Sequence, residues 1–380
     1  MLNPNIKEDF PVIENIGIYL DSSCMSLKPK QVINKINEYY NEYPACGERS
    51  MHKLGNKVTK EVEKARETIK KFINAKHTEE IIFTKNTTEA INLVANSFKF
   101  NKVLITDREH NSNFLPWTKH NFEVLDSKED FTFDLEKFKE KVKEVDLVSF
   151  VYTSNLDGYT LPVKEIIEIA HKNNVKVMLD AAQAAPHRKI DVKELDVDFL
   201  AFSGHKMLGP TGTGVLYAKK EILEKMKPFI LGGGTIFDAD YKSYKLEKLP
   251  HRFEAGLQDY AGIIGLGEAA KYLMKIGLKN IEEHEISLSK LINKDGLNQI
   301  GYKGDTGIFS FEIPGMDVHE TASILAETKN IAIRSGAHCM HPWFNKNNLK
   351  GSARASIYLY NTKEEIQILN NELEKLKKLV

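Results

Sequence analysis

Two neighbouring segments decide the fold: VKVMLD at residues 175–180 and VDFLAFSGHK at residues 197–206. Each begins as a short apolar run and ends in polar residues, with Asp180 closing the first and Lys206 the second. Short apolar runs bounded by polar turns are typical of strands that are buried on both faces of a sheet. Ligands of such sheets bind at the carboxyl ends of the strands, so we expect Asp180 and Lys206 to border one cleft.

More apolar runs and amphipathic helices extend this pattern along the chain. Further strands are predicted at residues 81–84, 103–106, 148–153 and 214–218. Between these runs, residues 59–75 and 163–173 carry apolar side chains at helical spacing. Strands that alternate with helices predict an α/β protein whose large sheet is mostly parallel and doubly wound, with both faces covered.

The pattern changes after residue 260. Long helices are predicted at residues 263–275, 281–292 and 363–379, with short strands between them. This arrangement favours a second, smaller α+β domain. The expected limits are 1–20 for an N-terminal segment that joins the small domain, 21–260 for the large domain and 261–380 for the small domain.

The composition excludes several classes of protein. The chain has 380 residues, of which 42% are hydrophobic, and this is enough for a sizeable core. Lys and Arg total 53, as do Asp and Glu, so the chain has no net charge to attract nucleic acid or a membrane surface. The N-terminus lacks the pattern of a signal peptide, and no apolar stretch reaches the roughly 18 residues of a membrane span. We therefore expect a cytoplasmic protein.

Three cysteines are present: Cys24, Cys46 and Cys339. Their odd number and wide spacing favour neither a disulfide framework nor a tetrahedral zinc site, so we expect no bound metal. The three thiols therefore have to be considered one by one.

Asp180 and Lys206 have simple alternative interpretations when each is taken alone. An aspartate after a strand is commonly a helix N-cap, and a lysine commonly lies at the surface. Together they suit pyridoxal phosphate, which needs a lysine amine for its aldehyde and an acid beside its ring nitrogen. Thr87 and Thr88 open a helix after a predicted strand, where hydroxyl and backbone N–H groups could bind the phosphate. An N-cap threonine explains the same pattern equally well.

A series of short motifs follows a fixed order along the chain. They are YLDS at 19–22, TTEAINLVAN at 87–96, EH at 109–110, SN at 154–155, DAAQ at 180–183, SGHK at 203–206, RFEAG at 252–256 and RSGAHC at 334–339. In content and order they resemble the class V family of pyridoxal-phosphate enzymes, and within it the cysteine desulfurases of the SufS type. The resemblance implies the type I fold of pyridoxal-phosphate-dependent transferases, pyridoxal 5'-phosphate as cofactor and a homodimer.

The resemblance also implies a role for each matching residue. Lys206 would bind the cofactor covalently, Asp180 would pair with the ring nitrogen, and His110 would stack over the ring and act in proton transfer. The other residues implied to bind the cofactor are Asn155 and Gln183 near the ring hydroxyl, and Thr87, Thr88, Ser203 and His205 at the phosphate. Side-chain donors of this kind suit a phosphate dianion.

Cys339 decides which reaction is expected. A free cysteine is usually a small buried hydrophobe, but this one lies in a polar stretch beside Arg334 and His338, a setting that favours a reactive thiol. In the family it is the catalytic nucleophile, and Arg354 matches the arginine that binds the substrate carboxylate, with Asn155 nearby. The planar guanidinium suits that task because it can donate two parallel hydrogen bonds to a carboxylate.

The implied reaction converts L-cysteine to L-alanine and leaves the sulfur as a persulfide on Cys339. A small acceptor protein would then take the sulfur for iron–sulfur cluster or thio-cofactor synthesis. Selenocysteine lyase, or another aminotransferase or lyase of the same family, is the alternative within this fold. A nucleotide-binding protein or a non-catalytic sulfur carrier is the alternative outside it, since the glycine-rich run at 262–267 superficially matches a dinucleotide loop.

Some positions depart from the family pattern. Cys24 stands where the family usually has alanine, and it is either a second thiol near the site or a packed small residue. Leu257 replaces a threonine that reaches the phosphate of the neighbouring subunit, which puts that contact in doubt, and Thr235 is a candidate to compensate. Asn86 replaces a glycine, which is tolerable because asparagine also visits positive φ. Ala337 replaces the first of two histidines before the cysteine.

Overall fold

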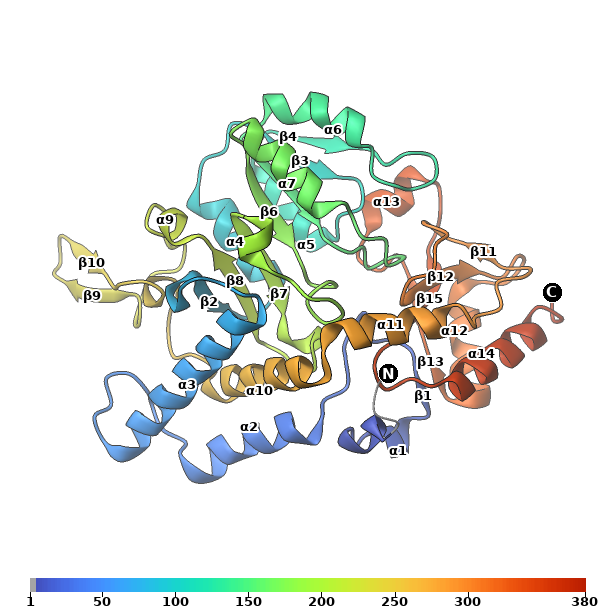
Figure 1. The fold of residues 1–380 in the computed structure, drawn as a ribbon, viewed down its shortest axis with the longest axis horizontal. Coiled ribbons are helices and arrows are strands. Elements are labelled where there is room, and N and C mark those ends of the chain that lie inside the picture. Colours follow the sequence, from blue (N-terminus) through green and yellow to red (C-terminus); the bar gives the residue numbers. More distant parts are fainter. Residues whose placement is uncertain (1–4) are drawn as a thin grey trace.

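The computed structural model describes residues 5–380, and its largest feature is a seven-stranded sheet (Figure 1). The strand order is β2-β8-β7-β6-β5-β3-β4, with β8 antiparallel to both neighbours and the other pairs parallel. The strands are β2 Ile81–Thr84, β3 Val103–Thr106, β4 Phe122–Leu125, β5 Leu147–Val151, β6 Lys176–Asp180, β7 Phe199–Ser203 and β8 Gly214–Ala218. The predicted α/β class with a mostly parallel large sheet is confirmed.

Strand β4 is the one member of this sheet that the sequence pattern does not predict. It lies at the sheet edge and pairs only with β3 in the described part of the chain. Three of its four residues are half-buried, and one of them is Glu123. An edge strand of this kind lacks the continuous apolar run that marks the central strands.

Side chains of the central strands alternate between two hydrophobic cores. On β6, Val177 and Leu179 pack into the first core, whereas Met178 packs into the second. This alternation follows from the two-residue repeat of a strand. The helices on the first core are α2 Lys30–Glu42, α3 Lys53–Phe72, α7 Val163–Lys172 and α10 Tyr260–Ile276, and α4 Thr87–Ser97 covers the second.

Helix α10 packs closely against α2 and α3, and two glycines permit the approach. A Cβ at Gly267 would lie 2.7 Å from the Cα of Ala65 on α3, and one at Gly265 would lie 2.8 Å from the side chain of Ile36 on α2. The glycine-rich run at 262–267 therefore lies inside a helix and serves helix packing. The interpretation of this run as a dinucleotide loop is wrong.

A second sheet of four strands, in the order β11-β12-β15-β14, is antiparallel throughout. Its strands are β11 Asn298–Gln299, β12 Ile308–Glu312, β14 Arg334–Gly336 and β15 Ser352–Ser356, and the nearby helices are α11 Leu278–Ser289, α12 Val318–Lys329 and α14 Lys363–Leu376. Strand β1, Ile18–Tyr19, pairs in parallel with β13, Ile331–Ala332. The domain limits at residues 20 and 260 stay predictions, and residues 1–4 lie outside the described part of the chain.

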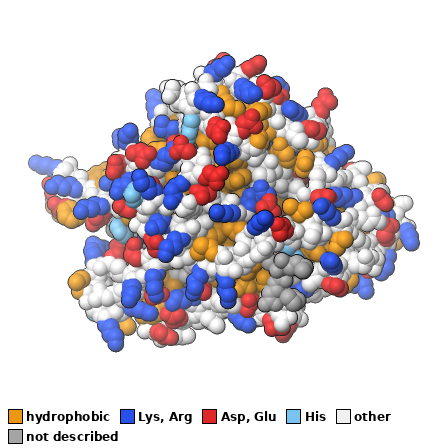
Figure 2. Space-filling model, viewed as in Figure 1, with side chains coloured by type: hydrophobic (Ala, Val, Ile, Leu, Met, Phe, Trp, Pro, Cys, Tyr) orange, Lys and Arg blue, Asp and Glu red, His pale blue; other side chains and the backbone are white. Residues whose placement is uncertain are grey.

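Several short elements complete the chain. They are α1 Ile13–Ile16, α5 Asn111–Phe114, α6 Leu135–Lys141, α8 Val192–Leu195, α9 Lys220–Leu223, α13 His341–Lys346, β9 Ile236–Ala239 and β10 Tyr244–Leu246. Strands β9 and β10 form an antiparallel hairpin that projects from the body of the molecule (Figure 1). Positive and negative side chains are interspersed over the face drawn in Figure 2, so this face carries no large patch of one sign. Within residues 5–380, no helix has the length and apolar character needed to cross a membrane.

A buried ion pair ties the large sheet to the segment before α10. Both Arg66 on α3 and Glu254 are buried, and two parallel hydrogen bonds join them at 2.8 and 2.9 Å. Glu254 also accepts from the backbone N–H of Phe83 on β2 at 2.7 Å, and Arg66 donates to the Ile81 carbonyl at 2.7 Å. Every charged group in this cluster therefore has a partner, as buried charges require.

We expect Glu254→Gln to lower the free energy of unfolding by roughly 3 kcal/mol, because the buried charge of Arg66 then keeps only the half-exposed Glu63, at 3.4 Å, as a counter-ion. The matched control is Glu136→Gln, which breaks an exposed pair with Lys139 on α6 and should cost about 0.5 kcal/mol or less. Urea unfolding of the three proteins measures both changes. Equal small losses in the two variants would contradict a structural role for the buried pair.

Candidate active site

Asp180 and Lys206 come together because β6 and β7 are adjacent and parallel. Asp180 is the last residue of β6 and aligns with Ala201 on β7, so both strands end at the same edge. Lys206 follows β7 in a short turn that begins at Gly204. A Cβ at Gly204 would collide with the hydroxyl of Thr213, so only glycine fits this turn.

A cavity of about 250 Å³ lies at this edge of the sheet. It is lined by residues from both sheets, and all eleven residues singled out from the sequence are among them. These are Thr87, Thr88, His110, Asn155, Asp180, Gln183, Ser203, His205, Lys206, Cys339 and Arg354. Residues that lie as far apart in the chain as 87 and 354 therefore share one site.

Burial sets the charge balance between Asp180 and Lys206. Burial raises the pKa of the Asp180 carboxyl, while the Ala182 N–H, which donates to it at 2.9 Å, and the charge of Lys206 oppose that rise. Desolvation lowers the pKa of the Lys206 amine, and Asp180 opposes this change. The site thus holds an acid and an amine that are each poorly solvated, and a ligand bearing complementary charge would stabilise both.

The N-terminus of α4 forms one end of the cavity. Asn86 is the N-cap, since its side chain accepts from the Glu89 N–H at 3.0 Å, so the idea that a threonine caps this helix is wrong. Thr87 and Thr88 follow it, and Thr87 shares a 2.6 Å hydrogen bond with the hydroxyl of Ser203. Hydroxyls and helix N–H groups gathered in this way suit a phosphate.

His205 lines the same cavity and is neutral near pH 7. Burial, together with the charges of Lys206 and Lys28, lowers its pKa to about 4. A neutral imidazole can donate one hydrogen bond without adding a positive charge next to Lys206.

Two buried amide oxygens in the cavity have no hydrogen-bond partner within residues 5–380. They are Oδ1 of Asn155 and Oε1 of Gln183. The amide nitrogens of both residues are already engaged, donating to the carbonyls of His338 at 2.9 Å and Ser23 at 2.7 Å. Unpaired buried acceptors are costly, so these oxygens are expected to accept from a ligand hydroxyl.

His110 is held as a neutral imidazole with a defined orientation. Its Nδ1 accepts from the Ser112 N–H at 3.0 Å, which leaves the ring proton on Nε2. Burial lowers the pKa of His110 to about 3, and the charges of Lys206 and Arg354 act in the same direction. His110 can therefore donate from Nε2.

Arg354 enters the cavity from β15 and is buried. Its Nη1 donates to the Asn155 carbonyl at 2.8 Å and its Nη2 to Asp21 at 3.3 Å. Its Nε has no hydrogen-bond partner in the described part of the chain. The guanidinium is thus held in place with its Nε free, which suits recognition of a small carboxylate.

Cys339 lies in the loop between β14 and α13. Both His338 and Cys339 have positive φ, at 48° and 58°. The backbone N–H of Asn111 donates to the Cys339 carbonyl at 2.7 Å, which anchors the loop to α5 beside His110. Beyond the cysteine, a small apolar cluster fixes the start of α13, and it consists of Leu156, Ile300, Met340, Trp343 and Phe344.

Three cavity neighbours are not singled out by the sequence. Asp21 binds Arg354, Ser112 shares a 2.7 Å hydrogen bond with Thr88, and the buried hydroxyl of Ser23 has no partner within residues 5–380. Asp21 lies inside a matching motif and could have been found there. Ser23 and Ser112 carry no pattern that marks them before the backbone is known.

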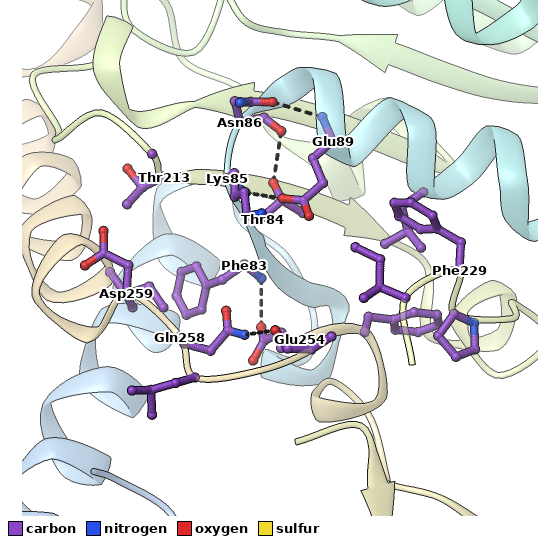
Figure 3. Close-up of a pocket in the computed structure, with 18 residues that line it drawn as sticks. Phe83, Thr84, Lys85, Asn86, Glu89, Thr213, Phe229, Glu254, Gln258 and Asp259 are labelled. Atoms are coloured by element: carbon purple, nitrogen blue, oxygen red, sulfur yellow. Dashed lines mark hydrogen bonds between the residues drawn. The ribbon is translucent and has the colours of Figure 1, made fainter. Parts of the chain in front are cut away.

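A larger cavity of about 540 Å³ adjoins the first at Asn86 (Figure 3). Leu257 lines it and is 76% exposed. Phe229 and Asp259 lie at opposite sides of this cavity in Figure 3. Thr235 is buried, and its hydroxyl bonds to Gly232 within its own turn at 2.9 Å. In this chain Thr235 is therefore engaged locally, and its compensation for Leu257 in a neighbouring subunit stays a prediction.

The model of the family described as aminotransferase class V matches residues 18–369. The chain belongs to this family. A relative from Halalkalibacterium halodurans, named probable cysteine desulfurase, is 42% identical, and the match covers 98% of this chain and 97% of the relative. One from Synechocystis, with the same name, is 39% identical over 98% and 95%.

Solved structures agree with the sequence relatives. The apo cysteine desulfurase from Thermococcus onnurineus has a TM-score of 0.94 and 37% identity, covering 100% of this chain and 99% of that one. The cysteine desulfurase CsdA from Escherichia coli, with an S-sulfonic acid, has a TM-score of 0.93 and 30% identity over the full length of both chains. This chain is a cysteine desulfurase of the class V family, which confirms the predicted family, fold and enzyme class.

Enzymes of the class V family use pyridoxal phosphate, and this cavity fits that cofactor. The unpaired oxygen of Asn155 or of Gln183 would accept from its ring hydroxyl, and the α4 N-terminus would bind its phosphate. Asp180 and Lys206 would hold its ring nitrogen and its aldehyde. When bound, the cofactor withdraws electrons from the α-carbon of an amino acid.

The buried imidazole of His338 makes the stability of the folded protein depend on pH. Burial lowers its pKa to about 3, so between that value and its ordinary 6.5 the unfolded chain binds a proton that the folded chain does not. Stability from this residue is present above pH 6.5 and is lost as the pH falls below it. We expect His338→Asn to reduce the loss of stability between pH 7 and pH 5.5 by about 1 kcal/mol.

Urea unfolding at the two pH values measures this difference. Asparagine is chosen because it tolerates the positive φ of position 338. If the free energy of unfolding fell equally in the two proteins between pH 7 and pH 5.5, His338 would bind a proton in the folded state as readily as in the unfolded chain, and its lowered pKa would be refuted.

Proposed function

We propose that this cavity converts L-cysteine to L-alanine and retains the sulfur as a persulfide on Cys339. The observation that carries this proposal is that the Cys339 thiol and the Lys206 amine line one cavity of about 250 Å³. An aminotransferase needs no thiol opposite its lysine, whereas sulfur transfer needs a nucleophile at that place. The cysteine desulfurase relatives support the same reading.

Arg354 would fix the substrate by its carboxylate. Its Nε is unpaired, and Asp21 occupies its Nη2 in the same way that a substrate carboxylate would. Because Asp21 also lies 3.8 Å from Arg334, it has a second arginine to pair with when substrate displaces it. Fixing the carboxylate orients the substrate sulfur toward the thiol.

Lys206 would remove the α-proton of the substrate. Burial lowers the pKa of its amine, and this favours the neutral, basic form that proton removal requires. Asp180, which accepts a hydrogen bond from the Ala182 N–H, would keep the ring nitrogen of the cofactor protonated. His110 carries its proton on Nε2, so it would act as a donor at the reacting group and not as a base.

Cys339 would then take the sulfur. Its thiolate attacks the sulfur of the substrate, a sulfur–sulfur bond forms, and the carbon–sulfur bond breaks. The electron pair stays on the carbon side: the β-carbon takes up a proton, the α-carbon regains the proton that Lys206 removed, and alanine leaves. No external oxidant or reductant enters this step, because the sulfane sulfur stays on the enzyme.

We expect Cys339→Ser to abolish alanine release from L-cysteine, with a loss of at least 10²-fold, while cofactor absorbance is unchanged. The nucleophile is removed but the cofactor contacts remain. Cys46→Ser is the control, because Cys46 is exposed and lies outside the residues that line the cavity. Alanine release at the wild-type rate in Cys339→Ser would refute the assignment, and amino transfer to a 2-oxo acid would point to the aminotransferase alternative.

We further propose that two copies of the chain pair over the larger cavity. Four large hydrophobic residues near it are more than 40% exposed: Phe229, Ile230, Leu231 and Leu257. The segment before α10 and the α4 N-terminus also line this cavity, so a second copy would pack next to the phosphate end of the site. An apolar group of this kind is typical of an interface.

We expect Leu257→Asp to weaken that dimer, because a carboxylate would be buried at the contact. Light scattering at several protein concentrations measures the molecular mass. The exposed residue Leu379, changed to Asp, is the control and should leave the mass unchanged. A wild-type protein that is monomeric at all concentrations would refute the proposed dimer.

A small sulfur-acceptor protein is the expected partner for the Cys339 persulfide. Cys339 is partly exposed, and its loop is short and anchored at both ends, so the sulfur can be reached from outside without unfolding the loop. Turnover should rise when a suitable acceptor is added. The pathway that receives the sulfur, such as iron–sulfur cluster assembly, is set by that acceptor.

A further inference from the structure

Cys24 lines the same cavity as Cys339, although the reaction described above gives it no task. It lies in the turn after β1, where its N–H donates to the Asp21 carbonyl at 3.0 Å. The preceding Ser23 donates its N–H to Ser356 at 2.9 Å and accepts from Gln183 at 2.7 Å. Both sheets thus hold this turn, and the thiol has a fixed place at the cavity wall.

The sulfur of Cys24 faces a positive charge. Nη1 of Arg334 donates to it at 2.8 Å, and Arg334 belongs to β14, the strand that leads into the Cys339 loop. A small packed residue would have needed no such partner. A guanidinium beside sulfur stabilises an anionic sulfur species, and a persulfide is anionic near neutral pH.

The cavity wall beside Cys24 also holds a donor that the reaction described above does not use. Ser23, the residue before Cys24, lines the cavity and is only 3% exposed, and its hydroxyl has no hydrogen-bond partner within residues 5–380. An unpaired buried hydroxyl indicates that this part of the site is built to donate to a ligand.

We propose that Cys24 is a second sulfur-carrying thiol, which takes the sulfane sulfur from Cys339 inside the cavity. This inference rests on the proposed function, since it needs a persulfide on Cys339. Cys24 attacks the outer sulfur of that persulfide and a new sulfur–sulfur bond forms at Cys24. The original bond to Cys339 breaks, and Cys339 keeps the electron pair and takes up the proton that Cys24 gives up. Nothing is oxidised or reduced, and Cys339 is free for another turnover.

The test is peptide mass spectrometry of the holoenzyme after a short exposure to L-cysteine and alkylation of all thiols. In the wild type, we expect the mass of one added sulfur on both the Cys339 and the Cys24 peptides. In Cys339→Ser, the Cys24 peptide should lose this label, since its donor is absent. In Cys24→Ser, Cys339 should stay labelled, and the sulfane sulfur released by cyanide should fall about twofold.

Cys46 supplies an internal control because it is exposed and outside the cavity. Three outcomes would overturn the inference: an unlabelled Cys24 beside a labelled Cys339, a label on Cys24 that persists in Cys339→Ser, or equal labelling of Cys46 and Cys24. A disulfide between Cys24 and Cys339 in place of a Cys24 persulfide would also overturn it, because the sulfur would then have left as sulfide. No label on Cys339 would instead refute the proposed function.

Discussion

The site depends on the burial of one carboxylate and one amine at the same edge of a sheet. The parallel pairing of β6 and β7 brings Asp180 and Lys206 there. Burial raises the pKa of the Asp180 carboxyl and lowers that of the Lys206 amine, so it favours the neutral form of both groups. Either group alone would be costly in this place, because a buried charge without a partner is strongly destabilising. A ligand that contacts both groups would offset this cost by pairing with each of them.

Two separate sheets have to meet for the site to be complete. The large sheet supplies Asp180 and Lys206, and the four-stranded sheet supplies Arg354 and the loop of Cys339. Several hydrogen bonds join these halves directly. Three of them lie at the cavity, and they run from Asn155 to the His338 carbonyl, from Arg354 to the Asn155 carbonyl and from Asn111 to the Cys339 carbonyl. A change in how the two sheets sit against each other would therefore alter the distance between amine and thiol.

Much of the fold could be predicted from the sequence because buried parallel strands have a strong pattern. The strands at 81–84, 103–106 and 214–218 agree to the residue, whereas the half-buried edge strand β4 has no such pattern. The strand ends predict that Asp180 and Lys206 border one cleft, whereas the roles of the other site residues depend on the matching motifs. The tautomer of His110 and the pairing of Arg354 with Asp21 depend on distances in space, so no sequence pattern could predict them.

The parallel pairing of β1 with β13 has a consequence for the nascent chain. Ile18 aligns with Ile331, so the first strand to leave the ribosome finds its neighbour only after more than three hundred further residues have been made. At translation rates of about 5–20 residues per second, this strand waits for tens of seconds. The apolar residues beside it, Leu20 among them, stay uncovered for that time and are natural binding sites for chaperones during synthesis.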